Sequence, residues 1–255
     1  MGNSSRRMFI KSAAITGIMA PFADAVLALD SSSKLHENGF VAADEKDNYL
    51  ESIKQELVKQ WPKNRTINLV FHGHSVPSGY FKTPDVRTLQ AYPHLLLKEL
   101  KNGYPHAVIN TILTCIGGEN SKKGADRFKK EVLNHRPDVL FIDYALNDRG
   151  IGLDASLASW EYMIKAALKK NIKVILLTAT PDQKVDINDN TTDLQKICDQ
   201  IRVLAKKYNI GLVDSYAAFQ KRISAGETLS DYMSQVNHPN EKGHQLVAEG
   251  IMKYF

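Results

Sequence analysis

Cysteine is scarce in this chain, with two residues in 255. Two cysteines form at most one disulfide, which cannot hold a fold of this length together, so a disulfide scaffold is excluded. The fold must be stabilised by its hydrophobic core. Hydrophobic residues make up 43% of the chain, an ordinary share that excludes intrinsic disorder. No Gly-x-Gly-x-x-Gly or P-loop motif follows any predicted strand, which argues against dinucleotide or phosphate binding.

The chain also lacks a concentrated basic surface signal. The formal net charge is +5, of which +2 falls in the first 28 residues, where Arg6, Arg7 and Lys11 oppose only Asp24, leaving +3 for the rest. Later lysines occur as scattered pairs, without an arginine-rich stripe or interleaved aromatic residues. We therefore attribute this charge to solubility and expect no nucleic-acid partner.

Long hydrophobic runs are absent even from the amino terminus. The run Ser5-Arg6-Arg7-Met8-Phe9-Ile10-Lys11 precedes 12 uncharged residues, Ser12 to Ala23, which are too few and too weakly apolar to cross about 30 Å of hydrocarbon. Small residues suited to cleavage after Ala25 or Ala28 follow. Residues 1–28 are therefore predicted to be a removable signal peptide, which leaves no stable membrane anchor.

The paired arginines resemble the bacterial twin-arginine signal, which implies export of a folded chain. A simple cationic region for general secretion is the alternative. No cysteine follows the apolar stretch, so lipid attachment there is excluded. We expect the mature protein in the periplasm or outside the cell.

Residues 29–65 are predicted to hold a leader, flexible over residues 30–42, and an N-terminal helix. Apolar residues recur at helical spacing before Pro62, which is expected to end the helix. These residues are Leu50, Ile53, Leu57 and Trp61.

Residues 66–255 alternate between short apolar runs and longer amphipathic stretches. The runs are rich in Val, Ile and Leu and are predicted to be strands buried on both faces: Thr66–His72, Ala107–Cys115, Asp138–Ala145, Lys173–Thr180 and Gly211–Tyr216. Helices are predicted near residues 93–102, 121–134, 155–170, 192–208 and 239–255. The alternation predicts a single α/β domain with a five-stranded parallel sheet between two layers of helices, α/β/α.

In such a sheet, ligands bind beyond the carboxyl ends of the strands. Four short segments are expected to meet there, and together they offer a serine, a glycine pair, an asparagine and a histidine. The segments are Gly73-His74-Ser75, Ile116-Gly117-Gly118-Glu119-Asn120-Ser121, Ala145-Leu146-Asn147-Asp148 and Asn237-His238-Pro239-Asn240.

These four segments, in this order, resemble the blocks of the SGNH hydrolases, also called GDSL-like esterases and lipases. The resemblance extends from about Asn68 to Phe255 and implies a flavodoxin-like fold without a cofactor. It implies that Ser75 is the nucleophile and His238 the general base. Gly118 and Asn147 would then supply oxyanion-hole donors, from a main-chain and a side-chain amide respectively.

The chemistry requires these residue types. A serine hydroxyl attacks an ester well only when a neighbouring base takes its proton, and an imidazole has a suitable pKa. The tetrahedral oxyanion needs donors already aimed at it, here the amides of Ser75, Gly118 and Asn147. Pro239 fits the first turn of the last helix and so fixes where His238 leaves the chain.

The sequence departs from the family pattern in three places. His74 replaces the usual aspartate of the first block, and Ala145 replaces the usual glycine of the third. Gln235 occupies the position, three residues before His238, where the family commonly has the triad aspartate. An amide oxygen can orient an imidazole but brings no negative charge.

Three arrangements follow from Gln235. The first is a Ser75–His238 dyad steered by Gln235 or by a main-chain carbonyl, which we take as the working hypothesis. The second is an acid supplied from elsewhere, such as Asp231. The third is an inactive protein.

Several functions are consistent with this site. The leading hypothesis is a serine esterase acting on short acyl groups, such as acetyl, on carbohydrate. The sequence lacks the broad hydrophobic lid that is expected of a triglyceride lipase. A lysophospholipase or thioesterase on the same site, or a non-catalytic glycan-binding homologue, are alternatives. Metal-dependent hydrolysis would need His72, His74 and His238 as ligands, but no convincing carboxylate accompanies them.

The remaining polar and thiol groups are interpreted structurally. We expect His244 to pack or stabilise a helix, and Asp148 to anchor the third loop. The loop from Val76 to Pro93 is a candidate wall of the substrate site. Cys115 and Cys198 are expected to be buried thiols, although their spacing leaves a single bridge open.

Overall fold

The computed structural model describes residues 48–255; the predicted signal peptide and flexible leader lie outside the described residues. A five-stranded, all-parallel sheet runs through the domain in the order β2-β1-β3-β4-β5. Its strands are β1 (Thr66–Gly73), β2 (Val108–Leu113), β3 (Val139–Asp143), β4 (Lys173–Leu177) and β5 (Gly211–Val213). The predicted α/β fold with a five-stranded parallel sheet is confirmed.

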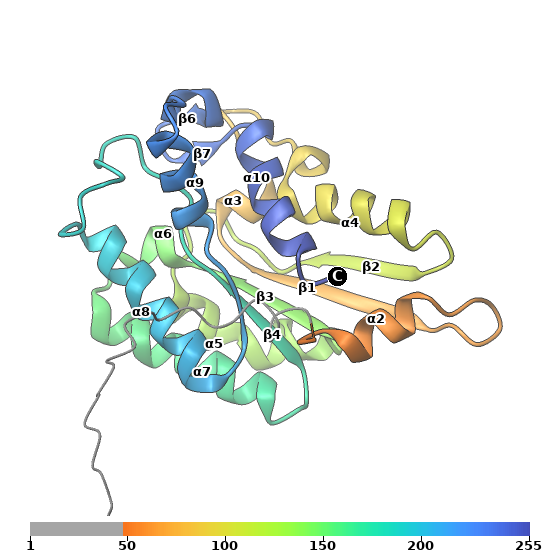
Figure 1. Ribbon diagram of the computed structural model, residues 1–255. Coiled ribbons are helices and arrows are strands. Elements are labelled where there is room, and N and C mark those ends of the chain that lie inside the picture. Colours follow the sequence, from red (N-terminus) through yellow and green to blue (C-terminus); the bar gives the residue numbers. More distant parts are fainter. Residues whose placement is uncertain (1–47) are drawn as a thin grey trace, which may run out of the picture. The chain divides into compact units, whose positions relative to one another are not determined.

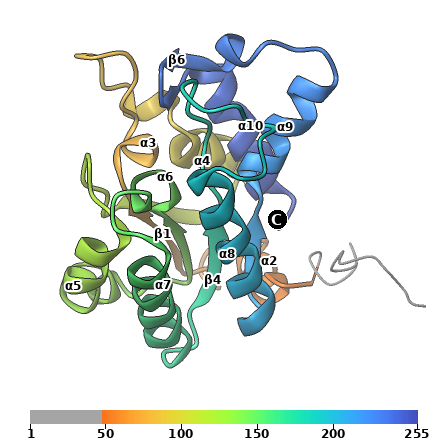
Figure 2. The same cartoon turned by 90° about the vertical axis from the view of Figure 1, so that its left-hand side faces the viewer.

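Helices cover both faces of the sheet (Figure 1). On one face α4 packs against α10, and on the other α5, α7 and α8 lie side by side (Figures 1 and 2). The longer helices are α2 (Glu51–Leu57), α4 (Tyr92–Gly103), α5 (Ser121–Glu131), α7 (Leu153–Leu168), α8 (Asp193–Tyr208), α9 (Ser215–Ser224) and α10 (Glu241–Met252).

Several short elements connect the longer ones. They are the single turns α3 (Ser75–Ser78) and α6 (Ala145–Asp148), the 3-10 turns η1 (Thr88–Gln90), η2 (Leu133–His135) and η3 (Leu229–Tyr232), and a small antiparallel hairpin of β6 (Met233–Gln235) and β7 (His238–Pro239). The sequence analysis did not predict α9 or the hairpin.

The core includes the central strands β1 and β3. Phe71 of β1 stacks on Phe141 of β3 with ring centroids 4.4 Å apart, and both rings are buried. Burying a side chain of this size stabilises the fold by about 1.5–3 kcal/mol. The strands β1 and β3, which precede two of the four segments, are therefore anchored in the core.

Two sequence expectations are wrong in detail. β2 is not buried on both faces: it is an edge strand, its residues are partly exposed, and Val108 is 47% exposed. The first helix ends at Leu57, and Trp61 is 85% exposed instead of continuing the apolar face. A residue before proline is disfavoured in helical geometry, which keeps Trp61 out of a helix but does not account for the end at Leu57.

The strand order reverses direction between β1 and β3, since the chain leaves β1 for β2 on one side and then crosses to β3 on the other. This reversal opens the crevice in which doubly wound proteins bind ligands. The segments that follow β1 and β3 begin at this point and carry Ser75 and Asn147.

Both cysteines, Cys115 and Cys198, are free thiols, so the bridge that the sequence left open is not formed. Within residues 48–255, no group of three or more His, Cys, Asp or Glu side chains is arranged to hold a metal ion. None of the helices in the same range is long and apolar enough to cross a bilayer.

Candidate functional site

Ser75 lies at the turn that leaves strand β1. β1 ends at Gly73, where an added Cβ would approach the carbonyl oxygen of Asp143 to 2.5 Å, so only glycine fits beside β3. Nδ1 of His74 accepts the main-chain N–H of Val76 at 3.3 Å and caps α3. Ser75 is thereby fixed as the first residue of that turn.

His238 contacts Ser75 directly. Its Nε2 lies 2.8 Å from Ser75 Oγ, although 163 residues separate the two along the chain. The β6–β7 hairpin positions the imidazole, and Ser234 Oγ donates to the carbonyl oxygens of His238 and Pro239, 3.1 Å from each. The N-cap of α10, Asn240, accepts the N–H of Gly243 and ties the hairpin to that helix.

Gln235 lies on the other side of the imidazole. Its Nε2 is 2.6 Å from His238 Nδ1, and its Oε1 accepts the main-chain N–H of Thr83 at 3.4 Å. With the amide turned this way, Nδ1 accepts and the imidazole proton sits on Nε2, facing Ser75. Turning the Gln235 amide by half a rotation presents its Oε1 to His238 Nδ1. The ring proton then sits on Nδ1, and His238 Nε2 is free to accept a proton. Asp231, the alternative acid, is exposed.

The electrostatic setting keeps His238 neutral. Burial lowers the pKa of His238 below its usual value of about 6.5, and the nearby imidazole of His74 lowers it further. At neutral pH the ring is therefore an uncharged imidazole, which is the form able to accept a proton.

Hydrogen bonds join the second segment to the first and the third segment to the second. The Ile116 N–H donates to the carbonyl oxygen of Gly73 at 3.1 Å, and Asn147 Nδ2 donates to the carbonyl oxygen of Glu119 at 2.9 Å. Gly118 takes a φ of +73°, a conformation that favours glycine. The structure thus brings the serine, glycine and asparagine segments to one sheet edge.

Asp148 anchors the third loop, as predicted. The buried carboxylate accepts three hydrogen bonds: from the N–H of Ser121 at 2.8 Å, and from Ser156 Oγ and Trp160 Nε1 at 2.7 Å each. These bonds join α6 to the first residue of α5 and to α7.

A buried polar network anchors Glu119, which follows the glycine pair of the second segment. The Glu119 carboxylate accepts from Arg127 Nε at 2.8 Å and from Tyr144 Oη at 2.7 Å. Nε2 of His72 lies 3.2 Å from Tyr144 Oη, and burial lowers the pKa of His72 to about 4. His72 therefore belongs to this network, apart from His238, and does not form the metal site considered from the sequence.

The loop after α3 supplies one aromatic residue to the site and one to the interior. The Tyr80 ring centroid lies 6.4 Å from that of His238, and an added Cβ on Gly117 would lie 3.1 Å from Tyr80 Oη. Tyr80, which is 42% exposed, thus lies between the histidine and glycine segments. Phe81 instead stacks on the buried His244, which packs in the interior as expected.

Sequence reasoning missed a buried contact between His74 and Asp143. His74 Nε2 lies 3.4 Å from Asp143 Oδ1, and Tyr92 Oη donates to Asp143 Oδ2 at 3.0 Å. The available signal was a carboxylate at the end of an otherwise apolar strand, β3.

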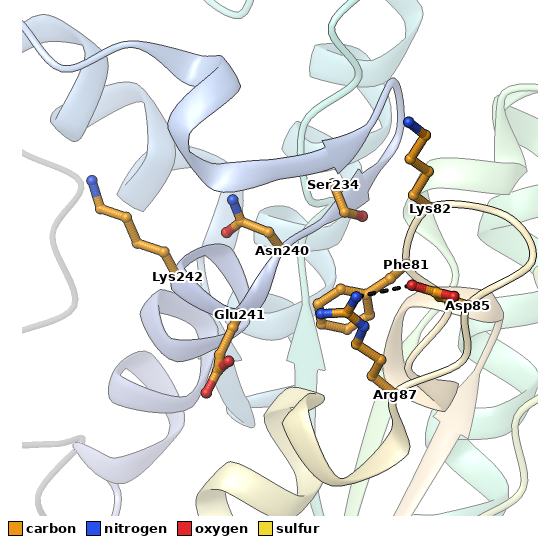
Figure 3. A pocket seen from close by; sticks show the side chains of 8 residues that line it. All are labelled: Phe81, Lys82, Asp85, Arg87, Ser234, Asn240, Glu241 and Lys242. Carbon is orange, nitrogen blue, oxygen red and sulfur yellow. Dashed lines mark hydrogen bonds and ion pairs between the residues drawn. The ribbon is translucent and has the colours of Figure 1, made fainter.

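A cavity of about 470 Å³ lies beside the hairpin (Figure 3). Ser75 and His238 do not line it. Its walls come from the loop after α3, from β6 and from the start of α10. They contain Phe81, Lys82, Asp85, Arg87, Ser234, Asn240, Glu241 and Lys242. Arg87 is paired with Asp85 at 2.9 Å and lies over the Phe81 ring, so its charge is already satisfied.

Solved structures share this fold. An acetylxylan esterase from Geobacillus stearothermophilus matches with a TM-score of 0.66 and 18% identity, over 77% of this chain and 95% of that one. A two-domain esterase active on acetylated mannans, co-crystallised with mannopentaose, matches with a TM-score of 0.65 and 22% identity, over 80% of this chain and 52% of that one. Comparison with curated protein sequences gives no match.

The model of the GDSL-like lipase/acylhydrolase family matches residues 71–246, a span that runs from the end of β1 into α10. This span contains all four segments that meet at the sheet edge. The chain therefore belongs to the GDSL-like lipase/acylhydrolase family and is an ester-hydrolysing enzyme.

Proposed function

We propose that this enzyme cleaves carboxylic esters with Ser75 as nucleophile and His238 as general base. The 2.8 Å contact between Ser75 Oγ and His238 Nε2 carries this proposal. As Oγ attacks the ester carbonyl, its proton moves to Nε2, and the imidazolium then returns it to the leaving alkoxide. Water repeats the sequence on the acyl-enzyme and releases the acid.

Three amides are proposed to stabilise the oxyanion: the main-chain N–H groups of Ser75 and Gly118 and the side chain of Asn147. Ser75 begins α3, so its N–H has no partner within that helical turn. Asn147 Nδ2 spends one hydrogen on Glu119 and keeps a second for the substrate. Losing one such donor typically costs about a hundredfold to a thousandfold in turnover.

Gln235 is proposed to steer the imidazole in place of an aspartate. The productive orientation has Oε1 accepting from the Nδ1–H of His238, which the amide reaches by rotating in place and giving up its 3.4 Å bond from the Thr83 N–H. We expect Gln235→Ala to keep a measurable fraction of activity and His238→Ala to keep almost none. Equal losses in the two variants would contradict the auxiliary role of Gln235.

We propose short acyl groups on carbohydrate as substrates. Tyr80 and Gly117 approach each other closely beside His238, which restricts the room for a long acyl chain. The fold neighbours include esterases active on acetylated xylan and mannan, which points the same way at low identity. The amino-terminal signal is proposed to export the enzyme to such extracellular glycans. Replacing both Arg6 and Arg7 with lysine tests whether export uses the twin-arginine route.

The decisive experiment compares acetylated sugars, longer-acyl esters and thioesters as substrates for the wild type and Ser75→Ala. We expect hydrolysis of the acetylated sugars by the wild type alone. Preference for long acyl chains or thioesters would favour a lysophospholipase or thioesterase. Absence of both turnover and fluorophosphonate labelling of Ser75 would instead indicate a non-catalytic glycan-binding protein.

A further inference from the structure

The main chain of Glu119 joins two of the proposed oxyanion donors. Its N–H donates to the carbonyl oxygen of Ile116 at 3.2 Å and closes the turn that contains Gly118. Its carbonyl oxygen accepts the hydrogen bond from Asn147 Nδ2 at 2.9 Å. A single residue therefore connects the turn that presents the Gly118 N–H with the side chain that presents the other donor.

The side chain of Asn147 depends on this contact for its orientation. The bond to Glu119 is the only hydrogen bond that this side chain makes to the described part of the chain. An amide nitrogen carries two hydrogens at a fixed angle, so the Glu119 carbonyl oxygen sets the direction of the second hydrogen, which is proposed to meet the substrate. A displacement of that carbonyl group would turn the donor away.

The buried side chain of Glu119 holds its main chain in place. Glu119 is 6% exposed, and its carboxylate accepts from Arg127 Nε at 2.8 Å and from Tyr144 Oη at 2.7 Å. Arg127 Nη2 bonds the same carboxylate and also donates at 2.6 Å to the carbonyl oxygen of Thr114, just after β2. The carboxylate is thus fixed to α5, to the residue after β2 and to the residue after β3.

Tyr144 completes a ring of contacts with Asn147. The carbonyl oxygen of Tyr144 accepts the main-chain N–H of Asn147 at 3.1 Å, while its Oη donates to the Glu119 carboxylate. Glu119 is therefore linked to Asn147 twice, directly through its carbonyl oxygen and indirectly through its carboxylate and Tyr144. These contacts fix the glycine turn and the asparagine relative to each other.

Stability alone does not account for a buried ion pair at this position. Such a pair is often no more stabilising than well-packed apolar residues, because both groups lose their hydration. Its directional bonds have another consequence, since oxyanion donors act when they are already aimed at the developing charge. A misplacement of about 1 Å can cost about a hundredfold in rate.

We propose that Glu119, held by Arg127 and Tyr144, is a positioning residue that aims the Gly118 N–H and the Asn147 side chain at the oxyanion. This inference rests on the proposed function. Glu119 neither touches the substrate nor moves a proton, and it acts through the two donors. Because the donors act on the charge that develops during the reaction, the loss of Glu119 is expected to lower kcat and to leave KM nearly unchanged.

The test is a double-mutant cycle between Glu119→Gln and Asn147→Ala, with kcat and KM measured for p-nitrophenyl acetate. Glutamine keeps the length of the side chain, but its amide nitrogen faces an N–H of Arg127 in either orientation, so two buried donors oppose each other. We expect Glu119→Gln alone to lower kcat about tenfold to a hundredfold and to change KM by less than about twofold.

In the Asn147→Ala background, Glu119→Gln is expected to cost at least about threefold less in kcat, because one of the donors that it positions is absent. Equal factors in the two backgrounds would overturn the inference, since a purely structural loss is independent of Asn147. A change confined to KM would also overturn it. Failure of the proposed function gives a different result: Ser75→Ala would equal the wild type, or Asn147→Ala would keep full turnover, and the inference would fall with it.

Two further variants keep the result interpretable. Glu131→Gln is the matched control, because its exposed carboxylate lies 3.3 Å from Nη1 of the same Arg127, and it is expected to change kcat by less than about twofold. Tyr144→Phe removes one bond to Glu119 and keeps the buried ring. It is expected to lower kcat about threefold to tenfold, and it takes the place of Glu119→Gln in the cycle if that variant does not fold.

Discussion

Replacing Asp148 with asparagine tests how the third loop is held against its neighbours. The carboxylate accepts one bond at Oδ1, from the Ser121 N–H, and two at Oδ2, from Ser156 and Trp160. An asparagine has one oxygen, and two bonds are kept when that oxygen takes the Oδ2 position. Its amide nitrogen then faces the Ser121 N–H, so two donors oppose each other in a buried site.

The expected cost follows from this count. Leaving the Ser121 N–H unsatisfied costs about 1–3 kcal/mol, and the two retained bonds weaken because their acceptor is no longer charged. We therefore expect the free energy of unfolding to fall by about 3 kcal/mol. For a domain of this size that lowers Tm by about 6–12 °C.

Urea and thermal unfolding of Asp148→Asn, with Asp126→Asn as the exposed control, measure this effect. The control is expected to change the free energy of unfolding by less than about 0.5 kcal/mol. A loss of less than about 1 kcal/mol in Asp148→Asn would show that the three bonds do not anchor the loop as described.

Two further predictions concern pH and packing. Burial lowers the pKa of His72 to about 4 and that of His244 to about 3. Below about pH 6.5 the unfolded chain therefore binds protons at these two residues that the native protein does not bind. The free energy of unfolding is expected to decrease as the pH falls through this range, with a combined slope of up to about 2.7 kcal/mol per pH unit. Urea unfolding from about pH 7.5 to about pH 5 measures it, and equal stability at both ends would contradict it. Gly73→Ala forces a Cβ to within 2.5 Å of the Asp143 carbonyl oxygen and is expected to lower esterase activity at least about a hundredfold. In the control Gly103→Ala the added Cβ meets nothing within 4 Å, and wild-type activity is expected. Equal activities in the two variants would refute the packing argument.

The strand pattern predicts the sheet because continuously apolar runs alternate with amphipathic stretches. It also predicts which side chains meet, since parallel strands share one carboxyl edge. The end of β5 was predicted too late: the run to Tyr216 looks apolar, but Asp214 caps α9 by accepting the N–H of Ala217, which stops the strand at Val213.

The contact between His74 and Asp143 could not be predicted, because it depends on the register of β1 against β3. Gly73 is aligned with Asp143, and a shift by one residue would turn the carboxylate to the other face of the sheet. Register between distant strands follows from packing across the whole sheet and leaves no local pattern in the sequence. The position of Gln235 beside His238, in contrast, was expected from its place three residues earlier in the family pattern, although the hairpin that joins the two was not predicted.

The β6–β7 hairpin makes the two halves of the site unequal in resistance to local unfolding. Ser75 follows an eight-residue strand with a neighbour on each side, whereas His238 begins a strand of two residues. Two hydrogen bonds join the hairpin to other loops. The Gln183 N–H donates to the carbonyl oxygen of Val236 at 2.8 Å, and the Thr83 N–H donates to Gln235 Oε1. Elements with few buried contacts open before the core does. Heating is thus expected to separate base from nucleophile while the sheet is intact, so that activity and amide protection of the hairpin disappear before the secondary structure does.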